Sequence, residues 1–139
     1  MVSSQSFALE GHRHILEWGT FGVIDPGQFN LAQQIAVDDE RNIYVADTGN
    51  SRIQKFTNNG EFLSSWGTNG IENGEFQSPT GIAIYENNIY VVDEKQNNIQ
   101  KFDSDGNFIL KWGGFGTEDS QFNYPKGITI DLNGIVYVA

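Results

Sequence analysis

The stretch NIYVADTGNSRIQKF, residues 42–56, decides the fold of this chain of 139 residues, because a close copy recurs as NIYVVDEKQNNIQKF at residues 88–102. Its first part, Ile43 to Ala46, is apolar on both alternating faces, which is typical of a short strand covered on both sides. Its last part, Ile53 to Phe56, alternates in polarity and predicts a strand further from the centre. The residues between the two parts favour a turn, so each copy predicts an antiparallel hairpin.

Three aromatic landmarks repeat in step with the hairpin, which indicates an array of structural repeats. Tryptophan recurs at spacings of 48 and 46 residues, phenylalanine at 47 and 46, and tyrosine at 46 and 47. The positions are Trp18, Trp66 and Trp112; Phe29, Phe76 and Phe122; and Tyr44, Tyr90 and Tyr137. The hairpin, with the W-G segment before it and the F-x-x-x-W-G segment after it, resembles the NHL repeat over nearly the whole chain.

The resemblance implies an all-β fold, an NHL-type β-propeller of radially arranged four-stranded blades, most often six in number. The chain holds three blades' worth of strands and no second domain. Its repeats lie at about residues 18–65, 66–111 and 112–139 plus 1–17. Because residues 7–18 match residues 102–112, we expect the chain to begin near the third strand of a blade and to stop after a second strand. One blade is then split between the termini.

The first and second repeats depart from each other at two places that bear on local structure. Inner strands are expected at about residues 33–37, 81–84 and 127–130. Asn98 stands where the first repeat has Arg52, an arginine that in NHL repeats commonly supports packing between neighbouring blades, so we expect one such contact to be lost. The first repeat also has Ala32-Gln33-Gln34 where the others read Pro-x-Gly. Its inner strand is therefore expected to start along a different backbone path.

The charge of the chain bears on its partners. Eight Lys and Arg against 18 Asp and Glu give a net charge of −10, and the basic residues are scattered singly. Nucleic-acid binding draws on clustered Lys and Arg, so nucleic acid is an unfavoured partner. No apolar run approaches the roughly 20 residues that cross a bilayer, and the first residues do not resemble a signal peptide. No membrane contact is expected, and the lack of Cys leaves the localisation open.

A catalytic or metal-binding role finds no support in the residue pattern, so we expect no enzyme activity, no cofactor and no metal. His12 and His14 lie two residues apart on an expected surface strand without an obvious further ligand. The run 103–106 opens like a calcium loop, but Gly114 stands where that loop needs its twelfth-position Glu, and a hairpin turn accounts for the run. The alternative is a fragment of a propeller lyase or lactonase whose catalytic residues lie outside this chain.

Eight residues are assigned structural roles. Asp47 and Asp93 each end a strand, where an aspartate often accepts hydrogen bonds from the backbone of the following turn, and Arg52 belongs to the first of these turns. A ring of metal-ligating aspartates is the alternative interpretation. The aromatic residues beside the strand ends are expected in the core between blades rather than in a binding stripe. They are Trp18, Trp66, Trp112, Phe56 and Phe102.

The long loops before the inner strands and the turns between the second and third strands leave a blade on one side, because neighbouring strands alternate in direction. Loops carried on a rigid scaffold are the usual binding surface, so we expect a protein or peptide ligand there. Phe21 and Phe115 are candidate anchors, although each ring could equally pin its own loop. Acidic residues flank them, namely Asp25, Glu72, Glu75, Glu94, Glu118 and Asp119.

Three blades are half of a six-bladed ring, which predicts self-assembly. The last strand pair, residues 127–139, lacks its outer partners, and the first pair, at about residues 5–18, lacks its inner ones. Both leave unpaired backbone edges that invite strand addition. Two chains joined head to tail would complete the split blades and close a ring by a rotation of 180° per chain. We therefore expect a homodimer.

Overall fold

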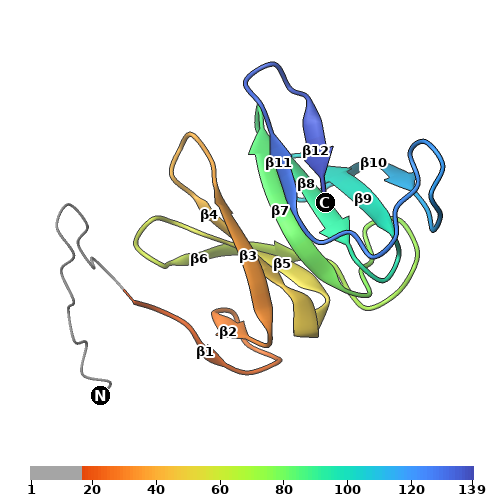
Figure 1. The fold of residues 1–139 in the computed structure, drawn as a ribbon. Coiled ribbons are helices and arrows are strands. Elements are labelled where there is room, and N and C mark those ends of the chain that lie inside the picture. The colour runs from red at the N-terminus through yellow and green to blue at the C-terminus, as the bar shows by residue number, and fades with distance from the viewer. Residues whose placement is uncertain (1–16) are drawn as a thin grey trace, which may run out of the picture.

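The computed structural model describes residues 17–139, which form three antiparallel sheets and one short parallel strand pair (Figure 1). The first sheet has the order β3-β4-β5-β6, the second sheet β7-β8-β9-β10, and the third sheet pairs β11 with β12. The bounds are β1 (Thr20–Phe21), β2 (Gln28–Phe29), β3 (Ala32–Val37), β4 (Ile43–Asp47), β5 (Arg52–Phe56), β6 (Phe62–Trp66), β7 (Pro79–Tyr85), β8 (Asn88–Asp93), β9 (Asn98–Phe102), β10 (Phe108–Gly113), β11 (Ile128–Ile130) and β12 (Val136–Val138). A short 3₁₀ helix, η1 (Thr48–Asn50), follows β4.

The predicted all-β fold of four-stranded units is confirmed. The two copies of the hairpin pair in the same register, from Asp47 opposite Arg52 in the first sheet and from Asp93 opposite Asn98 in the second. The turns between these strands end on equivalent residues in the left-handed region, Ser51 at φ 53° and Asn97 at φ 55°. The strands expected before residue 17, and both histidines, lie outside the described residues.

Each sheet has a leading face, which turns toward the preceding sheet, and a trailing face, which turns toward the next one. Apolar side chains alternate between the two faces along each strand, as a strand covered on both sides requires. The trailing face of the first sheet carries Tyr44, Ala46 and Ile53, which pack in one buried cluster with Ile82 and Val91 of the second sheet's leading face. The core of the molecule therefore lies between sheets.

Aromatic rings connect consecutive sheets in a repeated arrangement. Phe102 is fully buried, and its ring centroid lies 5.9 Å from Trp66, 5.7 Å from Phe76 and 6.0 Å from Phe108. In the first sheet, the ring of Phe56 has the equivalent neighbours. Its centroid lies 6.2 Å from that of Trp18, 5.7 Å from that of Phe29 and 5.9 Å from that of Phe62. Tilted and edge-on geometries of this kind add to the stabilisation from burial.

The third sheet packs on the trailing face of the second in the same way. Ile128 is buried against Tyr90, Val92 and Ile99, and the half-buried Trp112 joins this cluster at the place that Trp66 holds one repeat earlier. β11 lies against β7, as β3 does on the other side. The three inner strands are therefore neighbours at the centre of the array.

The inner strands β3 and β7 start with irregular pairing. The register shifts between Ala32 and Ile35 in β3 and between Pro79 and Gly81 in β7, and each strand carries one extra residue there relative to its partner. The pairing therefore does not show the different path that was expected for the first repeat. β7 also begins at Pro79, two residues before the predicted start. The side-chain Oε1 of Gln34 accepts a hydrogen bond from the backbone N–H of Ile82 over 3.2 Å, which links the first sheet to the second.

Candidate binding site

The loops before the inner strands and the turns after β4 and β8 form one end of the molecule, which we call the loop end. It comprises residues 19–31, 67–78 and 113–127 with turns 48–51 and 94–97. The loop that carries β1 and β2 lies at the lower edge of Figure 1, whereas the turns that join β3 to β4 and β11 to β12 point upward. All predicted binding-face residues lie in the loop end.

Each of the three loops is closed by the same short parallel backbone pairing, which the sequence analysis did not predict. Phe21 pairs with Phe29, Asn69 with Phe76, and Phe115 with Phe122. The N–H of the glycine after the first residue of each pair donates to the carbonyl of the second over 3.0–3.1 Å. We call this arrangement the loop bridge.

The loop bridge leaves Phe21 and Phe115 pointing outward. The second phenylalanine of each pair holds the loop to the sheet, since Phe76 is fully buried and lies so near Gly67 that a Cβ there would be 2.5 Å from its ring. Phe21 is 83% exposed and Phe115 is 70% exposed. Neither ring therefore pins its loop, and both are accessible to a partner.

Asp47 is the polar centre of the loop end in the first sheet. It is fully buried, and its carboxylate accepts from the Asn30 N–H over 2.8 Å, from Asn50 Nδ2 over 2.8 Å, from Arg52 Nε over 2.8 Å and from Gln54 Nε2 over 3.0 Å. These donors come from the preceding loop and from side chains, whereas the pattern predicted the backbone of the following turn.

Arg52 contacts the loop before its own sheet. Its Nη2 donates to the carbonyls of Gln28 over 2.8 Å and of Asp25 over 3.3 Å. Arg52 was expected to pack between neighbouring blades. In the structure it instead holds the connecting loop by hydrogen bonds. Fixing the loop in this way also fixes the backbone from which Phe21 projects.

In the second sheet Gln96 replaces the missing arginine. Asp93 accepts from the N–H groups of Gln77, Ser78, Lys95 and Gln96 over 2.7–3.1 Å, so here the following turn does contribute. Gln96 Nε2 donates to the carbonyls of Gly70 over 2.9 Å and Glu75 over 3.0 Å, where Asn98 is too short to reach. The loop contact is retained by a neighbouring side chain.

The predicted acidic residues differ in how freely they face solvent. The Glu75 carboxylate accepts from the Glu72 N–H over 3.0 Å and so shapes its own loop. Glu94 pairs with Lys126 over 3.4 Å at the surface. Asp25 accepts from Gln28 Nε2 over 3.2 Å. The remaining three, which are exposed, are Glu72, Glu118 and Asp119.

Five further apolar side chains are exposed at the loop end, although the sequence pattern did not mark them as candidates. Leu31 and Tyr124 are equivalent, and both adopt the left-handed region at φ 52° and 53°. This conformation is strained for bulky residues and is often found at functional sites. All five are apolar residues within polar loops, and this contrast in the sequence could have identified them. The five are Val23, Ile24, Leu31, Ile71 and Tyr124.

A hollow of about 420 Å³ lies at the loop end between η1 and the loop before β7. Its wall combines the exposed side chain of Leu31 with the polar residues Asn69, Gln77 and Ser78 and the ammonium-bearing Lys95. Amides and hydroxyls can pair with the carbonyls of a bound backbone, and the ammonium can pair with a carboxylate. The hollow is suited to a short peptide segment.

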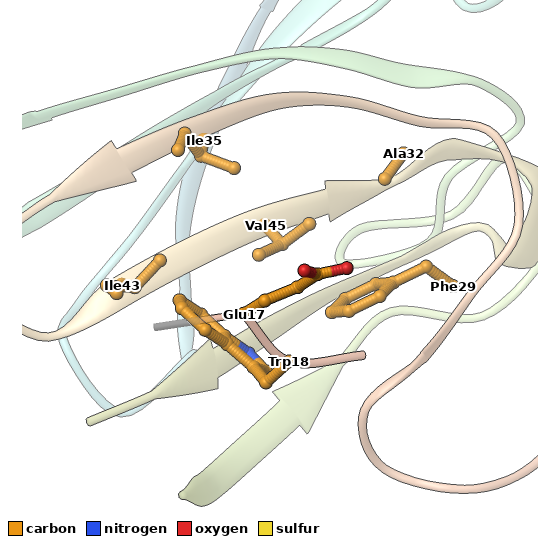
Figure 2. A pocket seen from close by; sticks show the side chains of 7 residues that line it. All are labelled: Glu17, Trp18, Phe29, Ala32, Ile35, Ile43 and Val45. Carbon is orange, nitrogen blue, oxygen red and sulfur yellow. The ribbon is translucent and has the colours of Figure 1, made fainter. Parts of the chain in front are cut away.

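A second hollow, which we call the sheet-face groove, lies on the leading face of the first sheet (Figure 2). It has a volume of about 350 Å³ and an almost wholly apolar lining. Figure 2 shows Ile35 and Ala32 on one side and Trp18 and Phe29 on the other, with Ile43 and Val45 of β4 between them. Ile35 is 63% exposed.

The comparison with protein families decides what kind of array these sheets form. Residues 28–131, which include the first two sheets and β11 of the third, match a family described as 6-bladed beta-propeller. The chain belongs to the six-bladed β-propeller family. Its repeats are of the NHL type, so the resemblance of the landmark residues is confirmed.

The propeller chain spans less than half of the length of the proteins described below, to which it is similar. Protein brain tumor of Drosophila melanogaster is 37% identical over 71 residues, which are 51% of this chain and 7% of that protein. A solved protein of unknown function from Bacteroides thetaiotaomicron aligns with a TM-score of 0.63 and 23% identity over 81% of this chain and 35% of its own. A catalytically inactive virginiamycin B lyase from Staphylococcus aureus, solved with quinupristin, aligns with a TM-score of 0.62 and 16% identity. The alignment covers 94% of this chain and 39% of the lyase. These two structures share the fold.

Within residues 17–139 of the propeller, no three His, Cys, Asp or Glu residues are grouped so that they could hold a metal ion. The same residues include no helix that is long and apolar enough to cross a membrane.

Proposed function

We propose that this propeller chain is a non-enzymatic interaction module that binds a protein or peptide segment at its loop end. The observation that carries the proposal is the exposure of Phe21 and Phe115 on loops that are rigidly held by the loop bridge. Exposed aromatic side chains on fixed backbone are typical anchors of protein interfaces, because they bury large areas at a low entropic cost. The hollow beside Leu31 supports the same choice of ligand.

A selection from a random peptide display library on the parent chain tests this role. Enriched peptides are then titrated against Phe21→Ser/Phe115→Ser. The matched control is Leu63→Ser/Ile109→Ser, which removes two exposed apolar side chains from equivalent positions of the outer strands β6 and β10. The loop-end variant should weaken binding about 30-fold or more, in the range of interface anchors, and the control should change it about twofold at most.

Failure to enrich any peptide that binds below about 0.1 mM would contradict the proposal, since even weak specific recognition reaches this range. Equal binding by the loop-end variant and the parent would also contradict it. Circular dichroism of both double variants shows whether the fold is kept, and the exposed positions of the four side chains lead us to expect that it is.

We further propose that two chains associate head to tail into a ring of six blades. The support comes from repeat equivalence. Ile35, Val37, Ile43 and Val45 correspond to Ile82, Ile84, Ile89 and Val91, which the first sheet covers. At the other side of the array, exposed residues of the third sheet correspond to the trailing-face residues Ala36, Tyr44 and Ala46. They are Thr129, Tyr137 and Ala139. These two faces are complementary, as a heterologous contact requires.

Light scattering tests the association. Ile35→Glu and Tyr137→Glu should each convert a dimer into a monomer, because each would bury an unpaired carboxylate in the contact. Leu63→Glu, on an exposed position of β6, should leave the dimer intact. A monomeric parent chain would contradict this proposal, as would a dimer that survives both substitutions.

A further inference from the structure

The end of the molecule opposite the loop end carries a hollow of its own, of about 320 Å³. Turns 38–42, 86–87 and 131–135, which follow the inner strands β3, β7 and β11, surround it. β3 and β11 both lie against β7, and two of the three turns point upward in Figure 1. We call the hollow between these turns the turn-end hollow.

The floor of the turn-end hollow is apolar. Val37, Ile84 and Ile130 occupy the same position in the three inner strands and line the hollow together. Leu132 lies at its edge and is 98% exposed. A large apolar side chain that is wholly exposed gains from contact with a partner.

The rim of the turn-end hollow is acidic. Its carboxylates belong to Asp38, Asp39, Glu86 and Asp131. The turns themselves hold two of them in place, since Asp38 accepts from the Asn42 N–H over 2.7 Å and Asp131 from the Ile135 N–H over 2.9 Å.

The charges around the turn-end hollow are predominantly negative. Backbone hydrogen bonds hold the pKa of Asp131 below its ordinary value, and hydrogen bonds to Asp38 outweigh the effect of burial on that group's pKa. Both are therefore ionised at neutral pH. Arg41 lies in the first of these turns, and the charge of Lys55 contributes to the low pKa of Asp38. Lys55 and Lys101 occupy equivalent places over the rings of Tyr44 and Tyr90.

The turn between β7 and β8 places Glu86 at the rim through an unusual backbone. Glu86 and Asn87 both adopt the left-handed region, at φ 48° and 60°. Two-residue turns of this type prefer Asn or Gly at both positions, so a glutamate is a costly choice there. The strained backbone at Glu86 places its carboxylate at the rim of the hollow.

We propose that the turn-end hollow receives an arginine side chain from a basic segment of a partner protein or peptide. The aliphatic stem of arginine packs on apolar surface while its charged head stays at the rim. The planar guanidinium pairs with two carboxylates at once, which a lysine ammonium does less well. The volume of the hollow lies at the lower end of the roughly 300–1,000 Å³ of ligand sites, as expected for an inserted side chain.

Fluorescence anisotropy with a labelled Gly-Ser peptide that carries two Arg-Leu pairs tests the proposal at about 0.15 M ionic strength. Asp39→Asn/Glu86→Gln removes two rim charges. Glu118→Gln/Asp119→Asn removes two exposed charges from the loop end and is the matched control for net charge. Two exposed charge pairs are together worth about a tenfold change in affinity, so the rim variant should bind about tenfold more weakly and the control within about twofold of the parent.

Two further measurements address the apolar floor and the guanidinium. Leu132→Ser should weaken binding severalfold, and the peptide with Lys in place of Arg should bind more weakly than the Arg peptide. Equal weakening by the rim and control variants would overturn the proposal, because the peptide would then respond to net charge alone. A parent chain that does not bind the Arg peptide, or binds the Lys peptide equally well, would also overturn it.

Discussion

Arg52 donates from Nε to Oδ2 of Asp47 over 2.8 Å, and the aspartate is fully buried while three other donors share its carboxylate. This asymmetry predicts unequal effects of removing either partner. Asp47→Ala should lower the free energy of unfolding by about 3 kcal/mol, because it removes the acceptor that four donors share and the only carboxylate paired with the Arg52 guanidinium among the described residues. Arg52→Ala should lower it by about 1–2 kcal/mol, because Asp47 keeps the other donors. Urea denaturation measures both, and a larger loss for Arg52→Ala would contradict this explanation.

Phe102 contacts three aromatic rings between the first and second sheets. Phe102→Ala should therefore lower the free energy of unfolding by about 3–5 kcal/mol, the cost of a large cavity in a core. Phe115→Ala is the matched control, because its exposed ring should contribute about 0.5 kcal/mol at most. Thermal or urea unfolding that does not distinguish the two variants would show that the contact between sheets is not the source of stability.

Gln96 holds the loop before β7 by two hydrogen bonds to backbone carbonyls. Gln96→Ala should speed amide hydrogen exchange about tenfold at Gly70 and Phe76, whose N–H groups form the loop bridge, since each lost hydrogen bond costs about 1 kcal/mol. Gln77→Ala, in the same loop, serves as the control and should leave these rates unchanged. Unchanged exchange in Gln96→Ala would mean that the loop bridge holds without this side chain.

The carboxylates of the turns predict a dependence of stability on pH. Burial would raise the pKa of Asp38, but hydrogen bonds from Asn42 and Tyr44 outweigh it and hold the pKa below the ordinary 3.8. A group of this kind stabilises the fold above the pKa of the unfolded chain and loses that contribution as pH falls through the folded value. The free energy of unfolding should therefore fall below about pH 3.8. Tyr44→Phe, which removes one donor to Asp38, should reduce the slope, and an unchanged slope in urea titrations would contradict the assignment.

The net charge of −10 predicts that single-stranded RNA is not retained by the chain. Filter binding at physiological ionic strength should give no saturable retention at micromolar protein. Submicromolar binding that weakens with added salt would contradict the prediction, because it would require a basic surface that the scattered Lys and Arg residues do not provide.

The hairpins were predictable because their signals are local. The apolar run from Ile43 to Ala46, the turn residues after Asp47 and the alternation from Ile53 to Phe56 indicate two paired strands without knowledge of any distant contact. Trp66 and Phe102 were likewise predicted to lie in a core between sheets, because each has a counterpart at the same position of another repeat. A residue that recurs at a fixed position meets the same neighbours in each repeat.

The candidate site was less predictable because its geometry depends on contacts between distant residues. The loop bridge joins residues seven or eight positions apart with no alternation to mark it, as with Asn69 and Phe76. The replacement of an arginine contact by Gln96 requires knowing which side chain reaches the loop carbonyls. The turn-end hollow forms only when Val37, Ile84 and Ile130 meet, and each alone reads as an ordinary strand residue.

The loop bridge separates the part of each loop that maintains the fold from the part that can vary. Backbone atoms make the hydrogen bonds of the bridge, and Phe29, Phe76 and Phe122 pack against the sheets. The outward side chains of Phe21, Asn69 and Phe115 take part in neither. The three repeats already hold two different residue types there. A combinatorial library at these three positions would therefore sample many surfaces on one unchanged framework, much as the variable loops of an antibody do.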